Sequence, residues 1–298
     1  MLAKKVRTHP APAVTDHNLE MLLPYLRNEL WKLFGKKRTY IGFGAFLLAQ
    51  NAMLLFFQLG PVKRRMEGLL SGNGYLAQEY ISALTVALFM ILPQIVMFMP
   101  LYATLVGGDL VAKEAEDGTL RMILSRPISR FQLLFAKGIA GAIFSILLVS
   151  VLGATALCFA RIWFPWRSMF VSLPGAGFSV LSAGEGLRLY LFSHVFTAIN
   201  ATAILGLAFM FSCFNMKPAA ATILALSFLF LNLVMESIPF FDHYQDWFLT
   251  HHFRAWLFVF ARPIPWSRMA ESFCILVAFS LTAFLIGAAA FQARDIKS

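Results

Sequence analysis

The chain has 298 residues, of which 59% are hydrophobic and only 13% are charged, and its formal net charge is +10. A water-soluble domain has roughly a quarter charged residues and cannot bury so large an apolar excess, so the composition excludes an ordinary soluble protein and predicts an integral membrane protein. Because the basic residues lie beside apolar stretches and no separate polar domain presents them, the charge favours membrane orientation over nucleic-acid binding.

Residues 1–38 are polar and basic, without the pattern of a cleaved signal, and they contain a short amphipathic segment. Pro24 is placed as the first residue of a helix, and Gly35 as the residue after its end. The apolar side chains between them fall on one helical face, namely Leu26, Leu30, Leu33 and Phe34. Trp31 and the basic cluster at 36–38 suit the lipid headgroup region. We therefore expect a cytoplasmic N-terminal segment that carries an interfacial helix.

Six later segments have the roughly 20 apolar residues that a helix needs to cross the bilayer. They are residues 39–59, 80–107, 131–159, 187–214, 219–238 and 269–291. The predicted fold is therefore an all-α integral membrane protein with a six-span domain at 39–291 and a short tail at 292–298. Lys and Arg are more abundant in the segments that lie inside if both termini are cytoplasmic, which favours a multi-pass protein of the cytoplasmic membrane in that orientation.

Several polar residues inside the spans are candidates for a transport pathway. Glu236 lies near the outer end of the fifth span, and an ionisable group there is a functional candidate by default. The alternative is a shallow, hydrated carboxylate that pairs with Arg254 or Arg262. His194 and Asn200 are also candidates, although hydrogen bonds between helices are the simpler role for both.

Other features of the spans and loops fit structural roles. Pro93 and Pro100 should kink the second span, and Lys137 should extend its amine toward the headgroups. The aromatic connections 161–186 and 240–266 should lie at the outer membrane interface. A cluster of acidic and histidine residues at 242–252 has no standard metal-ligand spacing, so we predict no metal site, and no catalytic motif assigns a catalytic residue.

The connection between the second and third spans carries the most specific pattern, GGDLVAKEAEDGTLRMILSRPISRFQLLFAK at residues 107–137. A turn signal at 117–118 is followed by a short amphipathic helix at 119–125, which Thr119 can cap. Pro127 ends this helix, and a capping box at 129–132 begins the next one. The pattern predicts a short, rigidly held helix at the inner face of the membrane.

The stretch EAEDGTLRMILSRPISR resembles the coupling segment in permease subunits of type-2, export-type ATP-binding-cassette (ABC) transporters. In that family an acidic-acidic-Gly-Thr-Leu run leads to a Leu-Leu-Ser-x-Pro-x-Ser-Arg run. The matching residues are Glu116, Asp117, Gly118, Thr119, Leu120, Leu124, Ser125, Pro127, Ser129 and Arg130. The pair Met122-Ile123 replaces the commoner aliphatic pair. A second stretch, NELWKLFGKKRTYIGF, is similar to the family's membrane-entry segment.

The resemblance implies that two permease subunits, identical or closely related, pack as a dimer in the lipid bilayer. Each coupling helix would sit in a groove of a separate ATPase subunit, with Glu114 and Arg121 as further contact residues. Closure of the ATPase subunits on ATP would then move the coupling helices and open the pathway. Because the chain has no GxxxxGK[ST] phosphate-binding loop, we expect it to bind no cofactor, with ATP and Mg on the partner subunit.

Two other classes of function stay open from the sequence. The first is a membrane-embedded enzyme that modifies lipids, using His194 or the acidic and histidine cluster at 242–252. The second is a membrane assembly factor that transports nothing. The aromatic loops and apolar spans are compatible with a hydrophobic drug, a lipid or a peptide as substrate.

Overall fold

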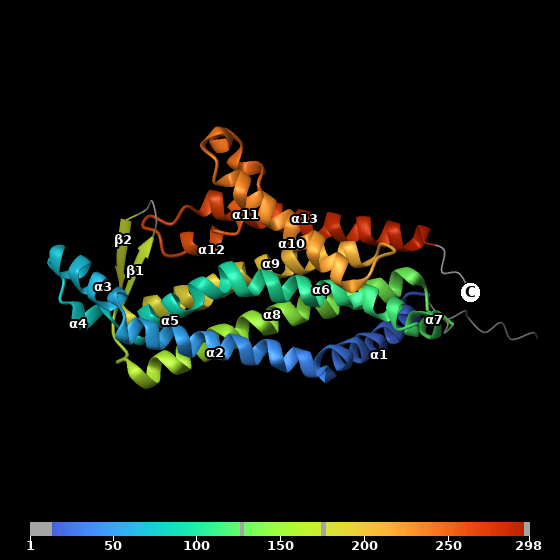
Figure 1. The fold of residues 1–298 in the computed structure, drawn as a ribbon, viewed down its shortest axis with the longest axis horizontal. Coiled ribbons are helices and arrows are strands. Elements are labelled where there is room, and N and C mark those ends of the chain that lie inside the picture. The colour runs from blue at the N-terminus through green and yellow to red at the C-terminus, as the bar shows by residue number, and fades with distance from the viewer. Residues whose placement is uncertain (1–13, 126–127, 174–176, 295–298) are drawn as a thin grey trace, which may run out of the picture.

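The computed structural model describes residues 14–125, 128–173 and 177–294, which form an elongated helical bundle (Figure 1). Within these residues six helices are long and apolar enough to cross a membrane. They are Lys37–Leu59 (α2), Ala83–Glu116 (α5 and α6), Arg130–Trp163 (α8), Ala183–Ser212 (α9), Pro218–Glu236 (α10) and Trp266–Ala293 (α13). The six expected spans are therefore confirmed, and most are longer than their apolar cores because polar residues extend the helices at their ends.

The second span is interrupted where proline was expected to disturb it. It consists of α5 (Ala83–Pro93), a π-helical segment (Gln94–Phe98) and α6 (Met99–Glu116). Pro93 and Pro100 flank the π-helical segment, and neither can donate a backbone hydrogen bond. A wider π turn is one way for a helix to continue past such missing bonds.

Helix α9 lies inside the bundle and packs against α6, α8 and α13. Small residues allow these close approaches. A Cβ atom on Gly107 of α6 would overlap the backbone carbonyl oxygen of Leu205 in α9. Gly108 faces α10 in the same way, with the Thr222 hydroxyl and the Pro218 carbonyl directly opposite. The glycine pair at 107–108 thus places α6 between α9 and α10.

The N-terminal helix α1 is longer than predicted. It extends over Val14–Gly35, with Pro24 inside it and not at its start. Proline lacks only its own amide hydrogen and disturbs one turn, so a helix can continue N-terminal to it when the flanking residues favour helix. Its apolar residues face the bundle: Leu33 is buried, and Leu26, Leu30 and Phe34 pack against the core. The position of α1 at a membrane interface stays a prediction.

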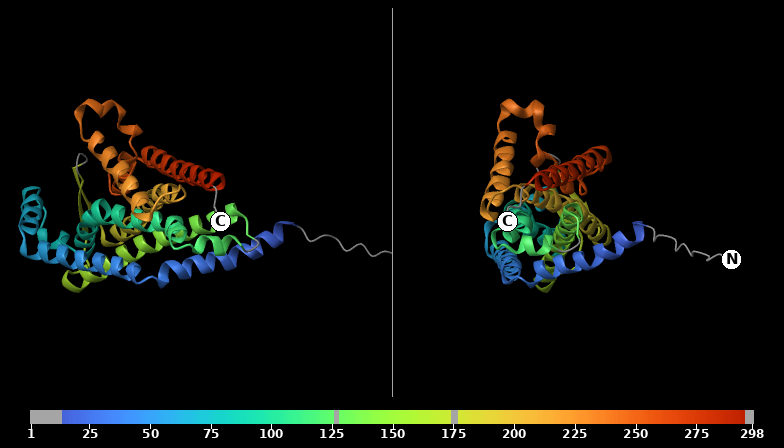
Figure 2. Two further views of the ribbon diagram at one scale, coloured as in Figure 1. Left: turned by 45° about the vertical axis from the view of Figure 1, so that its right-hand side comes forward. Right: turned by 90° about the vertical axis from the view of Figure 1, so that its right-hand side faces the viewer.

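A short helix, α7 (Thr119–Leu124), lies at the same end of the bundle as α1 and the end of α13 (Figure 1). We call this end the α7 end. The opposite end carries α3 (Pro61–Gly72), α4 (Ala77–Tyr80) and two strands, β1 (Met169–Leu173) and β2 (Gly177–Leu181). Between α10 and α13 come a 3-10 segment (Pro239–Trp247), α11 (Leu249–His252) and α12 (Ala255–Phe258). Helix α10 leans away from the other helices, so the 3-10 segment stands out from the bundle (Figure 2).

The two strands depart from a purely helical fold. They pair antiparallel, with Met169 opposite Leu181 and Val171 opposite Ser179. Met169, Val171 and Leu181 are buried, and the amide of Phe170 donates to the Thr85 hydroxyl of α5 at 2.9 Å. The aromatic and β-branched residues of this connection favour extended backbone, so the segment forms a hairpin that packs on the helices.

We predict that Gly107→Ala destabilises the protein by about 1–3 kcal/mol, because the added methyl group must push α6 away from the α9 backbone. Gly206→Ala is the matched control, since a Cβ atom on Gly206 meets nothing within 4 Å. Unfolding of both variants in mixed detergent micelles, followed by circular dichroism, checks the expectation. Equal stability of the two variants would show that the close approach at Gly107 is unimportant.

Candidate functional site

The turn that leads into α7 depends on one glycine. Gly118 has φ +73°, in the left-handed region that side chains disfavour, and it separates the end of α6 from α7. Thr119 does not cap α7, contrary to expectation. Its hydroxyl instead donates to the Glu114 carbonyl oxygen at 3.3 Å, because the reversal at Gly118 brings Thr119 back over the open carbonyls at the end of α6.

Helix α7 divides its residues between the bundle and the surface. Leu120 is only 3% exposed, and Ile123 and Leu124 pack against the core. Arg121, Met122 and Ser125 point outward, and Met122 is 66% exposed. Leu120 was expected to contact a partner, but the structure buries it, since the apolar side of so short a helix is needed to hold it to its own bundle. The surface open to a partner is therefore the side of α7 that carries Arg121, Met122 and Ser125.

The remaining residues of the segment have partners within the chain. Glu116 and Asp117 pair with Lys113, at 2.8 and 2.9 Å, on the exposed last turn of α6. Pro127 lies outside the described residues. Ser129 forms the predicted capping box at the start of α8. The Arg130 guanidinium donates to backbone carbonyls at the end of α13, the shortest of these bonds being 2.8 Å to Arg294.

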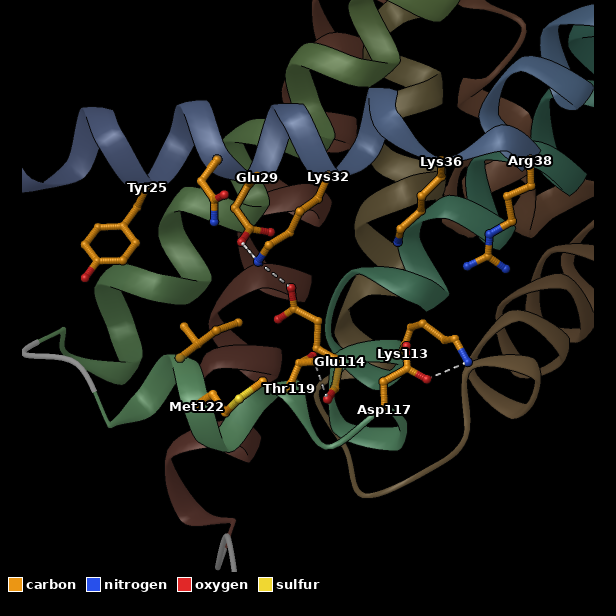
Figure 3. A pocket seen from close by; sticks show the side chains of 12 residues that line it. Tyr25, Glu29, Lys32, Lys36, Arg38, Lys113, Glu114, Asp117, Thr119 and Met122 are labelled. Carbon is orange, nitrogen blue, oxygen red and sulfur yellow. Dashed lines mark hydrogen bonds and ion pairs between the residues drawn. The ribbon is translucent and has the colours of Figure 1, made fainter.

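Four charged side chains form a closed ring of ion pairs just behind α7. Lys137 of α8 lies 2.6 Å from Glu29 of α1 and 2.8 Å from Glu114 of α6. Lys32 of α1 lies 2.7 Å from Glu29 and 2.8 Å from Glu114 (Figure 3). Each carboxylate gives one oxygen to each lysine, so positive and negative groups alternate. The ring joins α1, α6 and α8.

Lys137 corrects the expectation that its amine reaches the headgroups. It is 1% exposed, and its amine points into the ring. A buried charge needs an opposite charge because desolvation otherwise costs on the order of several kcal/mol. Glu29 and Glu114 provide it. Lys32 at the open side shows the same balance: burial lowers its pKa, but the hydrogen bonds that its amine donates to Glu114 and Glu29 outweigh burial and raise that pKa above the usual value.

A cavity of about 690 Å³ lies between α1 and α7 (Figure 3). Lys32 and Lys36 line it on the α1 side, and Thr119 and Met122 line it on the α7 side. Arg38 at the start of α2 forms an ion pair with Asp109 of α6 beside it. The candidate site is thus α7 together with this charged cavity and the ion ring at its base.

Glu236, the pathway candidate, is held at the end of α10. Arg254 pairs with it at 2.8 Å, and the Thr250 hydroxyl donates to it at 2.7 Å. Arg262 pairs instead with Glu185. Of the two expected partners the structure therefore selects Arg254, and the carboxylate fastens the end of α10 to α11 and to the residues that follow it.

His194 and Asn200 also have structural contacts. The Asn200 amide donates to the Phe253 carbonyl at 2.9 Å. Nδ1 of His194 lies 2.6 Å from the Tyr190 carbonyl, and the ring fills the space beside Gly153 of α8. In the 242–252 cluster, His252 contacts Ser272 and the Asp246 carbonyl. Among the described residues no three His, Cys, Asp or Glu side chains are grouped as a metal site.

Comparison with known proteins gives one result. The family described as ABC-2 family transporter protein matches residues 26–296. The match begins inside α1 and includes the ion ring, α7 and all six spans described above. No curated protein sequence matches the chain.

We predict that Lys137→Met lowers the free energy of unfolding by about 3–5 kcal/mol, because it leaves Glu29 and Glu114 buried without one of their two counter-charges. Lys113→Met is the matched control. Lys113 lies beside Glu114 near the end of α6, and its ion pairs with Glu116 and Asp117 are exposed, so its removal should change stability little. Adding Glu29→Gln to Lys137→Met should restore part of the loss. Denaturation in detergent checks the three variants, and an unchanged Lys137→Met protein would contradict the role given to the ring.

Proposed function

The chain belongs to the ABC-2 family of transporter membrane proteins, and from this premise we propose that it is the permease subunit of an exporter in the cytoplasmic membrane. A separate ATPase subunit hydrolyses ATP, binds Mg, and drives transport through contact with α7. The permease itself binds no cofactor in this proposal.

The observation that carries the proposal is the way in which α7 is held against the bundle. The helix is short, its outward side is free, and it follows the second span after a single glycine turn. Burial of Leu120 and the ion ring at Glu114 tie α7 and the end of α6 to α1 and α8. A force applied to Met122 or Arg121 would therefore be transmitted to α1, α6 and α8 together, as a coupling helix requires.

The proposed orientation places both termini and α7 in the cytoplasm. Helix α1, α7 and the last turn of α13 lie at one end of the bundle (Figure 1). The bias of Lys and Arg in the sequence favours the cytoplasm for this end. A coupling helix can meet a soluble ATPase only on that side.

We also propose a second permease subunit, either a second copy of this chain or a close paralogue. Helices α2, α10 and α13 leave most of their span residues uncovered within the described structure. Helix α10 in particular exposes Ile223, Phe230 and Leu231. Apolar surfaces of this kind are compatible with lipid and with packing against another subunit, so the dimer is supported by the family and tested by the mass of the purified assembly.

We predict that Gly118→Ala reduces the ATP hydrolysis that the permease stimulates in its ATPase partner by at least tenfold. A side chain at a left-handed residue costs about 1–2 kcal/mol, and the turn can relieve this strain only by moving α7. Gly74→Ala is the matched control, because Gly74 has a similar φ of +80° in a turn at the opposite end. Equal loss in both variants would contradict a coupling role for α7, as would transport that persists with a hydrolysis-dead ATPase.

We further predict that Ser125→Cys is labelled by a membrane-impermeant maleimide only when the reagent reaches the cytoplasm. Ser71→Cys in α3, at the opposite end, should be labelled from outside whole cells. The background replaces Cys158, Cys213 and Cys274, two of which are exposed. Labelling of Ser125→Cys from outside would reverse the orientation and remove the basis for ATPase contact.

A further inference from the structure

The cavity between α1 and α7 contains a cation that takes no part in the ion ring. Lys36 follows the end of α1, and its side chain points into the cavity between Lys32 and Arg38 (Figure 3). Lys32 is paired with Glu29 and Glu114. Lys36 makes no ion pair with any residue in the described part of the chain, and it is half-buried.

The charged side chains that line the cavity leave an excess of one positive charge. The cations are Lys32, Lys36, Arg38 and Lys113, and the carboxylates are Glu29, Glu114 and Asp117. Burial lowers the pKa of Lys36, and although Asp109 partly opposes this, the charges of Arg38 and Lys137 lower it further. A cavity that destabilises a lysine cation in this way favours an incoming anion, which would restore neutrality.

The two faces of α1 indicate whether the cavity opens toward lipid or toward the aqueous phase. Tyr25, Glu29 and Lys32 line the cavity and are spaced for one helical face. Leu23 and Trp31 lie on a different face of α1 and are 69% and 71% exposed. Large apolar side chains suit the lipid interface. With α1 at the membrane interface, as the sequence predicts, the cavity opens away from the lipid-facing side, so a lipid headgroup fits it less well than a group from the aqueous phase.

We infer that the cavity is a socket for an acidic side chain of the ATPase subunit, which forms an ion pair with Lys36; this inference rests on the proposed function. The other wall of the cavity is α7, where Met122 is exposed, so a protein that contacts α7 is adjacent to the opening. A carboxylate that enters accepts a charge-assisted hydrogen bond from the Lys36 amine. Contact on two walls would bind α1 and α7 to the same partner.

The test compares neighbouring lysines. The ATPase is first identified among proteins retained by the full-length chain through a peptide with a GxxxxGK[ST] motif, and the purified pair is then studied in detergent. Lys36→Glu should weaken the complex at least tenfold, and Lys36→Gln should weaken it less. Lys37→Glu changes the charge equally at the adjacent position, which is exposed and outside the cavity lining, and should weaken the complex less than threefold.

A third variant separates this inference from the proposed function. Arg121→Glu alters the exposed side of α7 outside the cavity lining and without touching the socket cation. If Arg121→Glu weakens the complex and Lys36→Glu does not, the socket is wrong and the proposed function stands. If neither variant has an effect, both are wrong. If Lys36→Glu and Lys37→Glu weaken the complex equally, or release bound anionic lipid equally, the cluster acts as a general basic patch and the socket is again wrong.

Chemical labelling of the unsubstituted protein tests the inference without the risk that a variant misfolds. An amine-acylating reagent should modify Lys36 in the isolated permease and at least tenfold more slowly in the complex with the ATPase. Lys63 of α3, at the opposite end of the bundle, provides the reference rate. Unchanged labelling of Lys36 in a verified complex would overturn the inference.

Discussion

The structure depends on the placement of four charges where α1, α6 and α8 meet. Lys137 and Glu29 are almost fully buried, so each needs an opposite charge at short range. Glu114 and Lys32 complete the set, and no member can move far without leaving another uncompensated. A buried ion pair adds little net stability over an apolar pair, but removal of one partner is strongly destabilising, so an arrangement of the helices that separates these four groups is disfavoured. The ring thereby fixes the position from which α7 starts.

Because α7 begins only five residues after Glu114, the ring acts almost directly on the short helix. The Gly118 turn sets its direction, and Leu120 holds it to the core. At the other limit of the connection, Arg130 ties the start of α8 to the end of α13. The connection between the second and third spans is thus fastened at both ends, although it lies outside the apolar spans.

Hydropathy was sufficient to predict the spans, because a stretch of apolar residues long enough to cross a bilayer is rare in water-soluble domains. It could not predict the contacts of Lys137. A lysine near the end of a span looks the same whether it extends toward water or turns inward, and its partners, Glu29 and Glu114, lie on other helices. The β1–β2 hairpin was missed for a similar reason, since its aromatic residues were interpreted as interface anchors and not as a pair of strands.

The coupling motif contains residues of two kinds, and the structure distinguishes them. Gly118, Leu120 and Arg130 serve the fold: they turn the chain, bury one side of α7 and join α8 to α13. Glu116, Asp117 and Ser125 are exposed at the surface. The sequence pattern therefore specifies how α7 is held to the bundle more than which surface α7 exposes. The family match covers the whole segment, and under the proposed function the specificity for one ATPase would come from the exposed side of α7 and the adjoining charged cavity.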